Sequence, residues 1–339
     1  MILVAGLLLW LSLSSIQVPE GESRTSFLLE NWNTADKWFL IFSGIMALVS
    51  HAVRAERWKI LLAPLGHQIS FKKSFLSVMI GYFVNLAIPR GGELSRCYNL
   101  YKLDDVPADE SFGTVIAERV VDLIFLVLLI AISFLIELDK LIEFFMAIDY
   151  SGGGKGAEGQ GFPWLYALGG VFFLGLIATV LYLRKKRILR LRILSKVITA
   201  FKGIKNGLRV IFKLKPGRRN FFIFYSLLIW VLYYLMSYFV ILAFPETENL
   251  GLLATLTIFV IGGIAMAIPL PGGTGSYHVL VPLGLSYLYQ LADDKAKAFT
   301  FIFHGWQLVI IIIFGLMALI WSRLLYKTKL RNANVRKNT

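Results

Sequence analysis

Residues 85–96 read NLAIPRGGELSR, and they close an apolar run that begins at Phe75. A proline, a pair of glycines and three charged residues stand where a membrane helix would be expected to continue. Proline removes a backbone donor and glycine allows positive φ angles, so the helix is predicted to break here. At membrane depth a broken backbone is tolerated only when it is buried in protein or lines a wet cavity. The stretch therefore predicts a buried break within a membrane protein.

The composition also indicates an integral membrane protein. Of 339 residues, 57% are hydrophobic and only 17% are charged, whereas a soluble domain of this size would carry more charge. The formal net charge is +14, but fourteen Lys and Arg residues, with no acid among them, fall within 184–219 between two apolar segments. That pattern is typical of a cytoplasmic loop facing anionic lipid. We therefore expect the membrane bilayer as a partner and no nucleic acid.

Little in the chain indicates catalysis or cofactor binding. The single cysteine, Cys97, excludes an internal disulfide, and the four histidines are scattered. There is no glycine-rich nucleotide loop and no nucleophile elbow, and the pairs Asp104-Asp105 and Asp293-Asp294 are interpreted as solvated loop residues. We expect no cofactor, no metal and no catalytic residue.

The apolar segments predict an all-α fold, a polytopic membrane helix bundle. The convincing segments are 37–55, 112–136, 163–183, 220–243, 251–268 and 297–322, with shorter ones at 1–16, 73–88 and 276–291. We interpret the chain as one membrane domain with two halves, about 37–183 and about 220–322, a basic linker at 184–219 and a basic tail at 323–339. The first short segment falls below the roughly 20 residues of a full span, and we interpret it as a tilted helix whose true start lies upstream.

Charge asymmetry gives each loop a side of the membrane. The basic loops 54–73 and 184–219 and the C-terminal tail are predicted to be cytoplasmic, and the segments 137–162 and 244–250 to face outside. It follows that 73–111 begins and ends inside, whereas 251–296 begins and ends outside. Each is therefore predicted to be a broken, re-entrant segment. We expect the cytoplasmic (inner) membrane of a prokaryote, with the C-terminus in the cytoplasm.

A second motif echoes the first. Residues 267–276 read AIPLPGGTGS, so Ala-Ile-Pro followed by Gly-Gly occurs once in each half. Because one broken segment would enter from inside and the other from outside, the pattern indicates an inverted repeat with a binding site between its halves. The alternative is chance recurrence in a glycine-rich apolar chain.

Charged residues gather near the first motif. Glu118 and Asp122 are four residues apart and share one helix face, with Arg119 on an adjacent face. Helices restarting at Gly92-Glu93 and near Ser276, its candidate N-cap, would direct free N–H groups at an anion, of which phosphate is the obvious one. The candidate lipid- or anion-binding residues are Asn85, Pro89, Arg90, Gly91, Gly92, Glu93, Arg96, Glu118, Arg119, Asp122, Pro271, Gly272, Gly273, Gly275 and Ser276.

Two interpretations of this cluster stay open. Arg90, Arg96 and Arg119 could neutralise the three acids in a purely structural network. Alternatively, an arginine fork could hold a lipid phosphate while the acids keep the empty site neutral. Arg54 and Arg57 are interpreted as snorkelling anchors at the cytoplasmic end of 37–55.

Four strings in order resemble the lysylphosphatidylglycerol synthase transmembrane-region family, which is flippase-like: SHAVRAERWKILL, GYFVNLAIPRGGELSR, ERVVDL and PLPGGTGSYH. The resemblance covers about 37–322. The residues that it carries over are Arg54, Arg57, Trp58, Asn85, Pro89, Arg90, Gly92, Glu93, Arg96, Glu118, Arg119, Asp122, Pro271, Gly272, Gly273 and Gly275. His278 stands where many relatives carry an acid, so the charge of the second half-site differs from the family pattern.

The resemblance implies that in multidomain relatives this region translocates an aminoacylated lipid, which a separate cytosolic domain makes. We do not expect that domain in a chain that ends soon after residue 322. We expect a flippase-like protein that binds or translocates a phosphate-bearing lipid, either an anionic phospholipid or a polyprenyl-linked sugar, in a central cavity. The alternatives are a membrane glycosyl- or aminoacyl-transferase, and a structural subunit of a lipid-modifying complex that docks through 184–219. A homo-oligomer or a partner lipid-modifying enzyme fits any of these functions.

Overall fold

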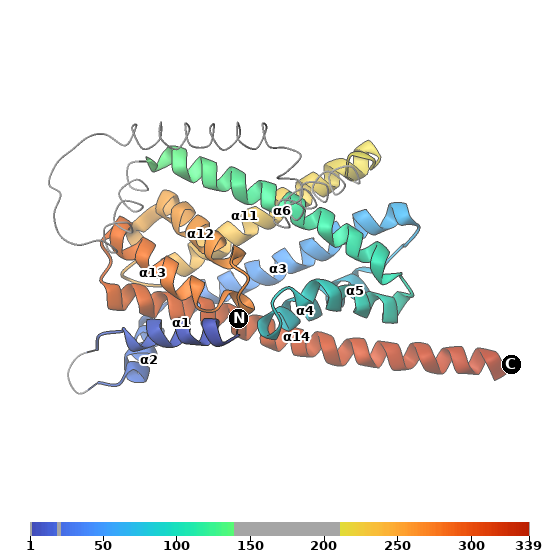
Figure 1. Cartoon of the computed structure of the whole chain (residues 1–339), viewed down its shortest axis with the longest axis horizontal. Coiled ribbons are helices and arrows are strands. Elements are labelled where there is room, and N and C mark those ends of the chain that lie inside the picture. The colour runs from blue at the N-terminus through green and yellow to red at the C-terminus, as the bar shows by residue number, and fades with distance from the viewer. Residues whose placement is uncertain (1, 19–21, 139–210, 339) are drawn as a thin grey trace, which may run out of the picture.

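A computed structural model describes residues 2–18, 22–138 and 211–338. In these ranges the chain forms helices and no strands, which confirms the all-α prediction (Figure 1). The helices are α1 (Ile2–Ser14), α2 (Arg24–Thr34), α3 (Lys37–Leu62), α4 (Phe71–Ala87), α5 (Gly91–Asp104), α6 (Ala108–Ile136), α11 (Pro216–Leu242), α12 (Gly251–Ala267), α13 (Ser276–Tyr289) and α14 (Asp293–Asn338), with 3₁₀ turns η1 (Ala63–Leu65), η2 (Glu248–Leu250) and η3 (Pro271–Gly273). The expected span 163–183, all but the first two residues of the outside loop 137–162 and most of the basic linker 184–219 lie outside the described residues.

Side-chain caps start several of these helices. The carboxylate of Asp36 accepts the Trp38 N–H at 2.7 Å at the start of α3, and Ser70 caps α4. Ser23 caps α2, a helix that the search for long apolar runs did not predict. Its 11 residues, RTSFLLENWNT, contain no long apolar run, and only Phe27 and Asn31 are buried.

Within the described ranges, five helices are long and apolar enough to cross a membrane: Lys37–Leu65, Ala108–Ile136, Pro216–Leu242, Glu248–Ala267 and Asp293–Val335. Their outer faces expose large apolar side chains such as Leu128, Phe221 and Ile313, which a bilayer would cover. The remaining helices near the breaks are shorter. At about 1.5 Å per residue, α4 with 17 residues and α5 and α13 with 14 each fall short of the roughly 30 Å hydrocarbon core.

The helices α3 to α6 and α11 to α14 follow the same order of lengths, with two shorter helices between two longer ones. The helices α4 and α12 have 17 residues each, and α5 and α13 have 14 each. The α4/α5 pair lies toward the end of the bundle where α6 begins, and the α12/α13 pair lies toward the opposite end (Figure 1). The two breaks meet between them, since a Cβ atom at Gly272 would lie 3.3 Å from the Leu86 side chain. The order and lengths agree with the predicted inverted repeat, which stays a prediction.

Each short-helix pair has its own apolar core. Val281 and Leu285 of α13 pack with Ile258 of α12 and Phe299 of α14. In the other pair, Trp58 of α3 packs with Cys97 and Leu100 of α5 and Val115 of α6. Polar residues are thereby left to the region where the α4/α5 pair faces α3, α6 and α11.

Candidate functional site

The first break is a close contact between the backbones of α4 and α5. A Cβ atom at Gly92 would lie 2.0 Å from the carbonyl oxygen of Gly81 and 2.7 Å from Asn85 Cγ, so only glycine fits. The Asn85 side-chain oxygen accepts the Gly92 N–H at 2.7 Å, which satisfies one free donor of the new helix. Helix α5 restarts at Gly91, after Arg90 has turned the chain in the left-handed region with a φ of 61°. The break is therefore a fixed part of the structure.

Beside the break, five buried side chains form a continuous series of ion pairs. Asp122 of α6 bridges two arginines of α3, with Oδ2 2.7 Å from Arg54 Nη1 and Oδ1 2.7 Å from Arg57 Nη1. Glu118, one turn earlier, continues the series, with Oε1 3.3 Å from Arg57 Nε and Oε2 2.9 Å from Arg96 Nη2 of α5. The last contact lacks the alignment of a hydrogen bond. These charges tie α3, α5 and α6 together.

The snorkelling interpretation of Arg54 and Arg57 is wrong. Arg57 is 0% exposed and Arg54 is 4% exposed. Their guanidinium groups also reach α11, where Arg57 Nη1 donates to Ser226 Oγ at 3.0 Å and Arg54 Nη2 donates to Tyr233 OH at 3.2 Å. The physical reason is that the two carboxylates of α6 offer both arginines buried partners, and charges within a membrane bundle pair inward.

Trp58 supports the far end of this series. Its indole N–H donates to Thr114 Oγ1 at 2.8 Å, and the Arg96 guanidinium carbon lies 3.8 Å from its ring centroid. A cation stacked on an indole face is favourable, most of all when it is desolvated. Trp58 therefore helps to hold Arg96 in place through a cation–π contact.

A second ion pair lies closer to the surface. Arg119 Nη2 of α6 is 2.7 Å from Glu93 Oε1, with side-chain exposures of 47% and 16%. The other carboxylate oxygen of Glu93 is buried and has no hydrogen-bond partner in the described structure. This pair is separate from the buried series.

A small hollow lies between the two sets of charges. It is lined by Arg54, Val78, Gly81, Tyr82, Asn85, Gly92, Glu93, Arg96 and Arg119. Its free space is that of about one water molecule. Of the three arginines predicted to surround Glu93, Arg96 and Arg119 line this hollow and Arg90 does not. An anion the size of phosphate needs this hollow to widen.

The predicted site residues fall into distinct positions. Asn85, Gly92, Glu93, Arg96 and Arg119 line the hollow, and Glu118 and Asp122 hold its arginines from behind. Pro89, Arg90 and Gly91 belong to the break without lining the hollow. Arg90 is exposed and has no ion pair within the described ranges, so the predicted fork does not include it.

The charges do not balance as expected. The buried series has three arginines (Arg54, Arg57, Arg96) and two acids (Glu118, Asp122), which leaves a formal charge of +1. The Arg119–Glu93 pair adds no net charge. In addition, Arg54 Nε, Arg57 Nη2 and Arg96 Nε are buried without a hydrogen-bond acceptor in the described structure. The buried series therefore carries one more positive charge than its own acids balance, and several of its N–H groups have no acceptor in the described structure.

The second break differs from the first, where only Arg90 has a positive φ, in both backbone geometry and chemistry. Gly272, Gly273 and Gly275 have φ angles of 58°, 72° and 95°. The polar groups here are neutral or aromatic: His304 Nε2 lies 2.9 Å from the Gly272 carbonyl oxygen, and Tyr277 stacks on His304 with ring centroids 5.0 Å apart. None of the five predicted residues of this break, Pro271, Gly272, Gly273, Gly275 and Ser276, lines the hollow.

Ser276 is not the N-cap of α13. Gly275 occupies the cap position, because its φ of 95° suits glycine and is strained for serine. Ser276 is the first helical residue, and its hydroxyl donates back to the Ala265 carbonyl oxygen at 2.8 Å. That bond joins the start of α13 to the end of α12.

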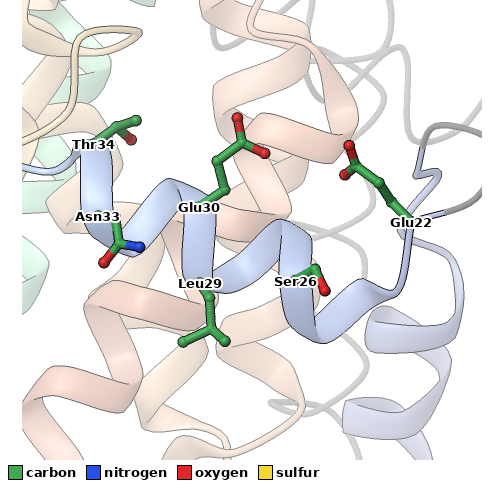
Figure 2. Close-up of a pocket in the computed structure, with 6 residues that line it drawn as sticks. All are labelled: Glu22, Ser26, Leu29, Glu30, Asn33 and Thr34. Carbon is green, nitrogen blue, oxygen red and sulfur yellow. The ribbon is translucent and has the colours of Figure 1, made fainter.

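A larger depression lies on the outer face of α2, away from the charged cluster (Figure 2). Its lining residues are Glu22, Ser26, Leu29, Glu30, Asn33 and Thr34. All six are exposed, five of them belong to α2, and Glu22 lies two residues before its start, so no second element closes the space. Among the described residues, no group of three or more His, Cys, Asp or Glu side chains could hold a metal ion.

Comparison with known proteins agrees with the fold. The family model described as the lysylphosphatidylglycerol synthase TM region matches residues 1–315. The chain belongs to this family. A UPF0104 membrane protein of Methanothermobacter thermautotrophicus is 24% identical over 278 residues, which covers 75% of this chain and 76% of that protein.

Other archaeal relatives match over shorter stretches. A UPF0104 membrane protein of Methanocaldococcus jannaschii is 37% identical over 87 residues, and one of Pyrococcus horikoshii is 32% identical over 108 residues. The matched part spans 26% and 32% of these two proteins. No solved structure matches the chain.

Proposed function

We propose that this protein binds or translocates a phosphate-bearing lipid, in the manner of a flippase, at the hollow beside the first break. The observation that carries the proposal is the unbalanced charge of the buried series, in which Arg54 and Arg96 both line the hollow and have N–H groups without acceptors. An uncompensated buried charge is costly in a membrane bundle. An anion is the ligand that would remove this cost.

The donors suit a phosphate group. Guanidinium groups bind phosphate oxygens in a planar, two-pronged geometry. The start of α5 adds the positive end of a helix dipole, while its Gly91 and Gly92 N–H groups already donate to the Ile88 carbonyl oxygen and Asn85 Oδ1. Tyr82 lines the hollow and its hydroxyl lies 3.1 Å from that of Tyr233, which supplies hydroxyl groups for further oxygens.

A lipid is favoured over a soluble anion because of where the site lies. The hollow is formed by α3, α4, α5 and α6, and both α3 and α6 are long apolar helices with lipid-facing outer surfaces. The family description also refers to the membrane region of a lipid synthase. For a headgroup to enter, the α4/α5 pair has to move relative to α6, and an inverted repeat would provide such a motion.

Two other functions are weaker candidates. A transferase needs a free carboxylate or similar base, but Glu118 and Asp122 each contact two arginines and Glu93 contacts Arg119. A structural subunit would explain the ion pairs but not the surplus positive charge. Phosphate-bearing lipid is therefore the ligand class that accounts for most of the site.

The test compares two variants of Arg96 in purified protein. Arg96→Ala is expected to abolish binding of a fluorescent phosphatidylglycerol, and Arg96→Lys to weaken it about tenfold, because lysine keeps the charge without the planar fork. Lys73→Ala is the matched control. It breaks the 2.5 Å pair with Asp104 at the far end of the same helix pair, and binding is expected to stay at the wild-type level.

Dithionite quenching of the same lipid in reconstituted liposomes then separates binding from translocation. If Arg96→Ala unfolds the protein while Arg96→Lys binds lipid as well as wild type, the cluster is a scaffold and the proposal is wrong.

A further inference from the structure

Glu93 differs from the other two acids of the cluster. Glu118 and Asp122 are each shared by two arginines, whereas among the described residues Glu93 forms an ion pair with Arg119 alone and through one oxygen. Its second oxygen is buried without a hydrogen-bond partner in the described ranges. Glu93 is therefore the acid that the cluster holds least firmly.

The position of Glu93 is the one that a ligand anion would need. Its side chain lines the hollow together with Arg54, Arg96 and Arg119, and it stands in the first turn of α5. Arg54 and Arg96 are each more than nine-tenths buried and have N–H groups without acceptors. An incoming phosphate would meet the same guanidinium groups and the same helix start.

We propose that the Glu93 carboxylate is a built-in competitor of the ligand, which a phosphodiester group displaces from Arg119 on binding. This inference rests on the proposed function and concerns the regulation of the same site. The exchange is balanced in charge, because a phosphodiester monoanion replaces one carboxylate. It also supplies the missing space, since the hollow holds only about one water while Glu93 is in place.

Displacement has a direction and a consequence. Arg119 is about half exposed, so the freed Glu93 carboxylate has a route toward water. When it returns to Arg119 it opposes the ligand and helps to release it. A carrier needs such reversible binding, because a ligand held too firmly is not delivered.

The experiment measures the Kd of dihexanoyl phosphatidylglycerol for the full-length protein in phosphatidylcholine nanodiscs. Glu93→Gln is expected to lower this Kd about tenfold, which corresponds to about 1.4 kcal/mol, and to slow dithionite-detected translocation. Inorganic phosphate serves as a second probe, and tightening toward the lipid but not toward free phosphate identifies a headgroup. Glu118→Gln makes the same chemical change at the acid held by two arginines and is expected not to tighten binding.

The outcomes separate the two proposals. If wild type binds, Arg96→Ala does not, and Glu93→Gln leaves the Kd unchanged or raises it, the competitor idea is wrong and the proposed function stands. Absence of binding by both wild type and Glu93→Gln overturns both. Equal tightening in Glu118→Gln shows a general charge effect and also overturns the inference. Should Glu93→Gln fold poorly, Glu93→Asp shortens the reach to Arg119 and is expected to tighten binding about threefold, with no change counting against the idea.

Discussion

The two breaks lie between helices of matching length and carry different side chains. Each follows a helix of 17 residues, contains a Gly-Gly pair and precedes a helix of 14 residues. At the first break, the long helix that follows, α6, brings Glu118, Arg119 and Asp122. At the second break, the corresponding helix α14 brings His304, and Leu8 of α1 lies where a Cβ atom at Gly275 would come within 2.8 Å. Glycine and proline thus make the shape of a break, and the next long helix decides its chemistry.

The largest expected difference in stability between the two breaks comes from removing a buried acid at the first. Glu118→Ala leaves Arg57 and Arg96 without a shared carboxylate, and a broken buried pair costs about 3–5 kcal/mol. His304→Ala at the second break removes one neutral hydrogen bond, at about 1 kcal/mol. Thermal unfolding in detergent should therefore rank the first variant far below the second. Equal melting temperatures would show that the charged cluster is not what holds the first half together.

Glycine substitutions compare the two backbones directly. Gly92→Ala places a Cβ atom 2.0 Å from a backbone oxygen, so α4 and α5 have to separate, with an expected loss of about 2–3 kcal/mol. Gly272→Ala meets the flexible Leu86 side chain at 3.3 Å and suffers mainly the strain of a positive φ, about 1 kcal/mol. Chemical or thermal unfolding of the two single variants checks the order. A more harmful Gly272→Ala would mean that the second break is the tighter one.

Asn85 tests whether the first break depends on its side-chain cap. Asn85→Ala removes the bond to the Gly92 N–H, with an expected loss of about 1 kcal/mol in stability. Lipid affinity should fall as well, since the same amide lines the hollow. At the second break the Gly273 N–H donates to the Leu270 carbonyl oxygen and not to a side chain, so the result sharpens the contrast. An unchanged melting temperature would indicate that water satisfies this N–H equally well.

The smallest expected effect is at Arg90. Its φ of 61° is strained for arginine, so Arg90→Gly should increase the free energy of unfolding by up to about 1 kcal/mol. The melting temperature should rise slightly. Lipid binding should not change, because Arg90 does not line the hollow. Loss of binding in this variant would show that Arg90 takes part in lipid binding, as the sequence predicts.

The sequence anticipates backbone features better than side-chain partners. Proline and glycine dictate local geometry, so the restarts at Gly91 and Ser276 lie within one residue of their predicted places. The prediction that Arg54 and Arg57 are snorkelling anchors was wrong, because a hydropathy pattern locates the end of a helix but does not show which helix packs against it. A signal was nevertheless present: arginines three apart on one helix match the acids four apart on another. Helix α2 was not predicted, because its short sequence is mostly polar and has few apolar residues to indicate a buried face.

Because α14 is long and unbroken, a small tilt near its start moves its C-terminal end by a much larger distance. Its 46 residues extend about 69 Å, more than twice the roughly 30 Å hydrocarbon core, and its C-terminal end projects beyond the other helices (Figure 1). His304, near its start, contacts the second break. A tilt of about 10° about that point would sweep the far end through roughly 9 Å. A spin label placed there would therefore report, in magnified form, a rearrangement at the breaks that is itself too small to resolve.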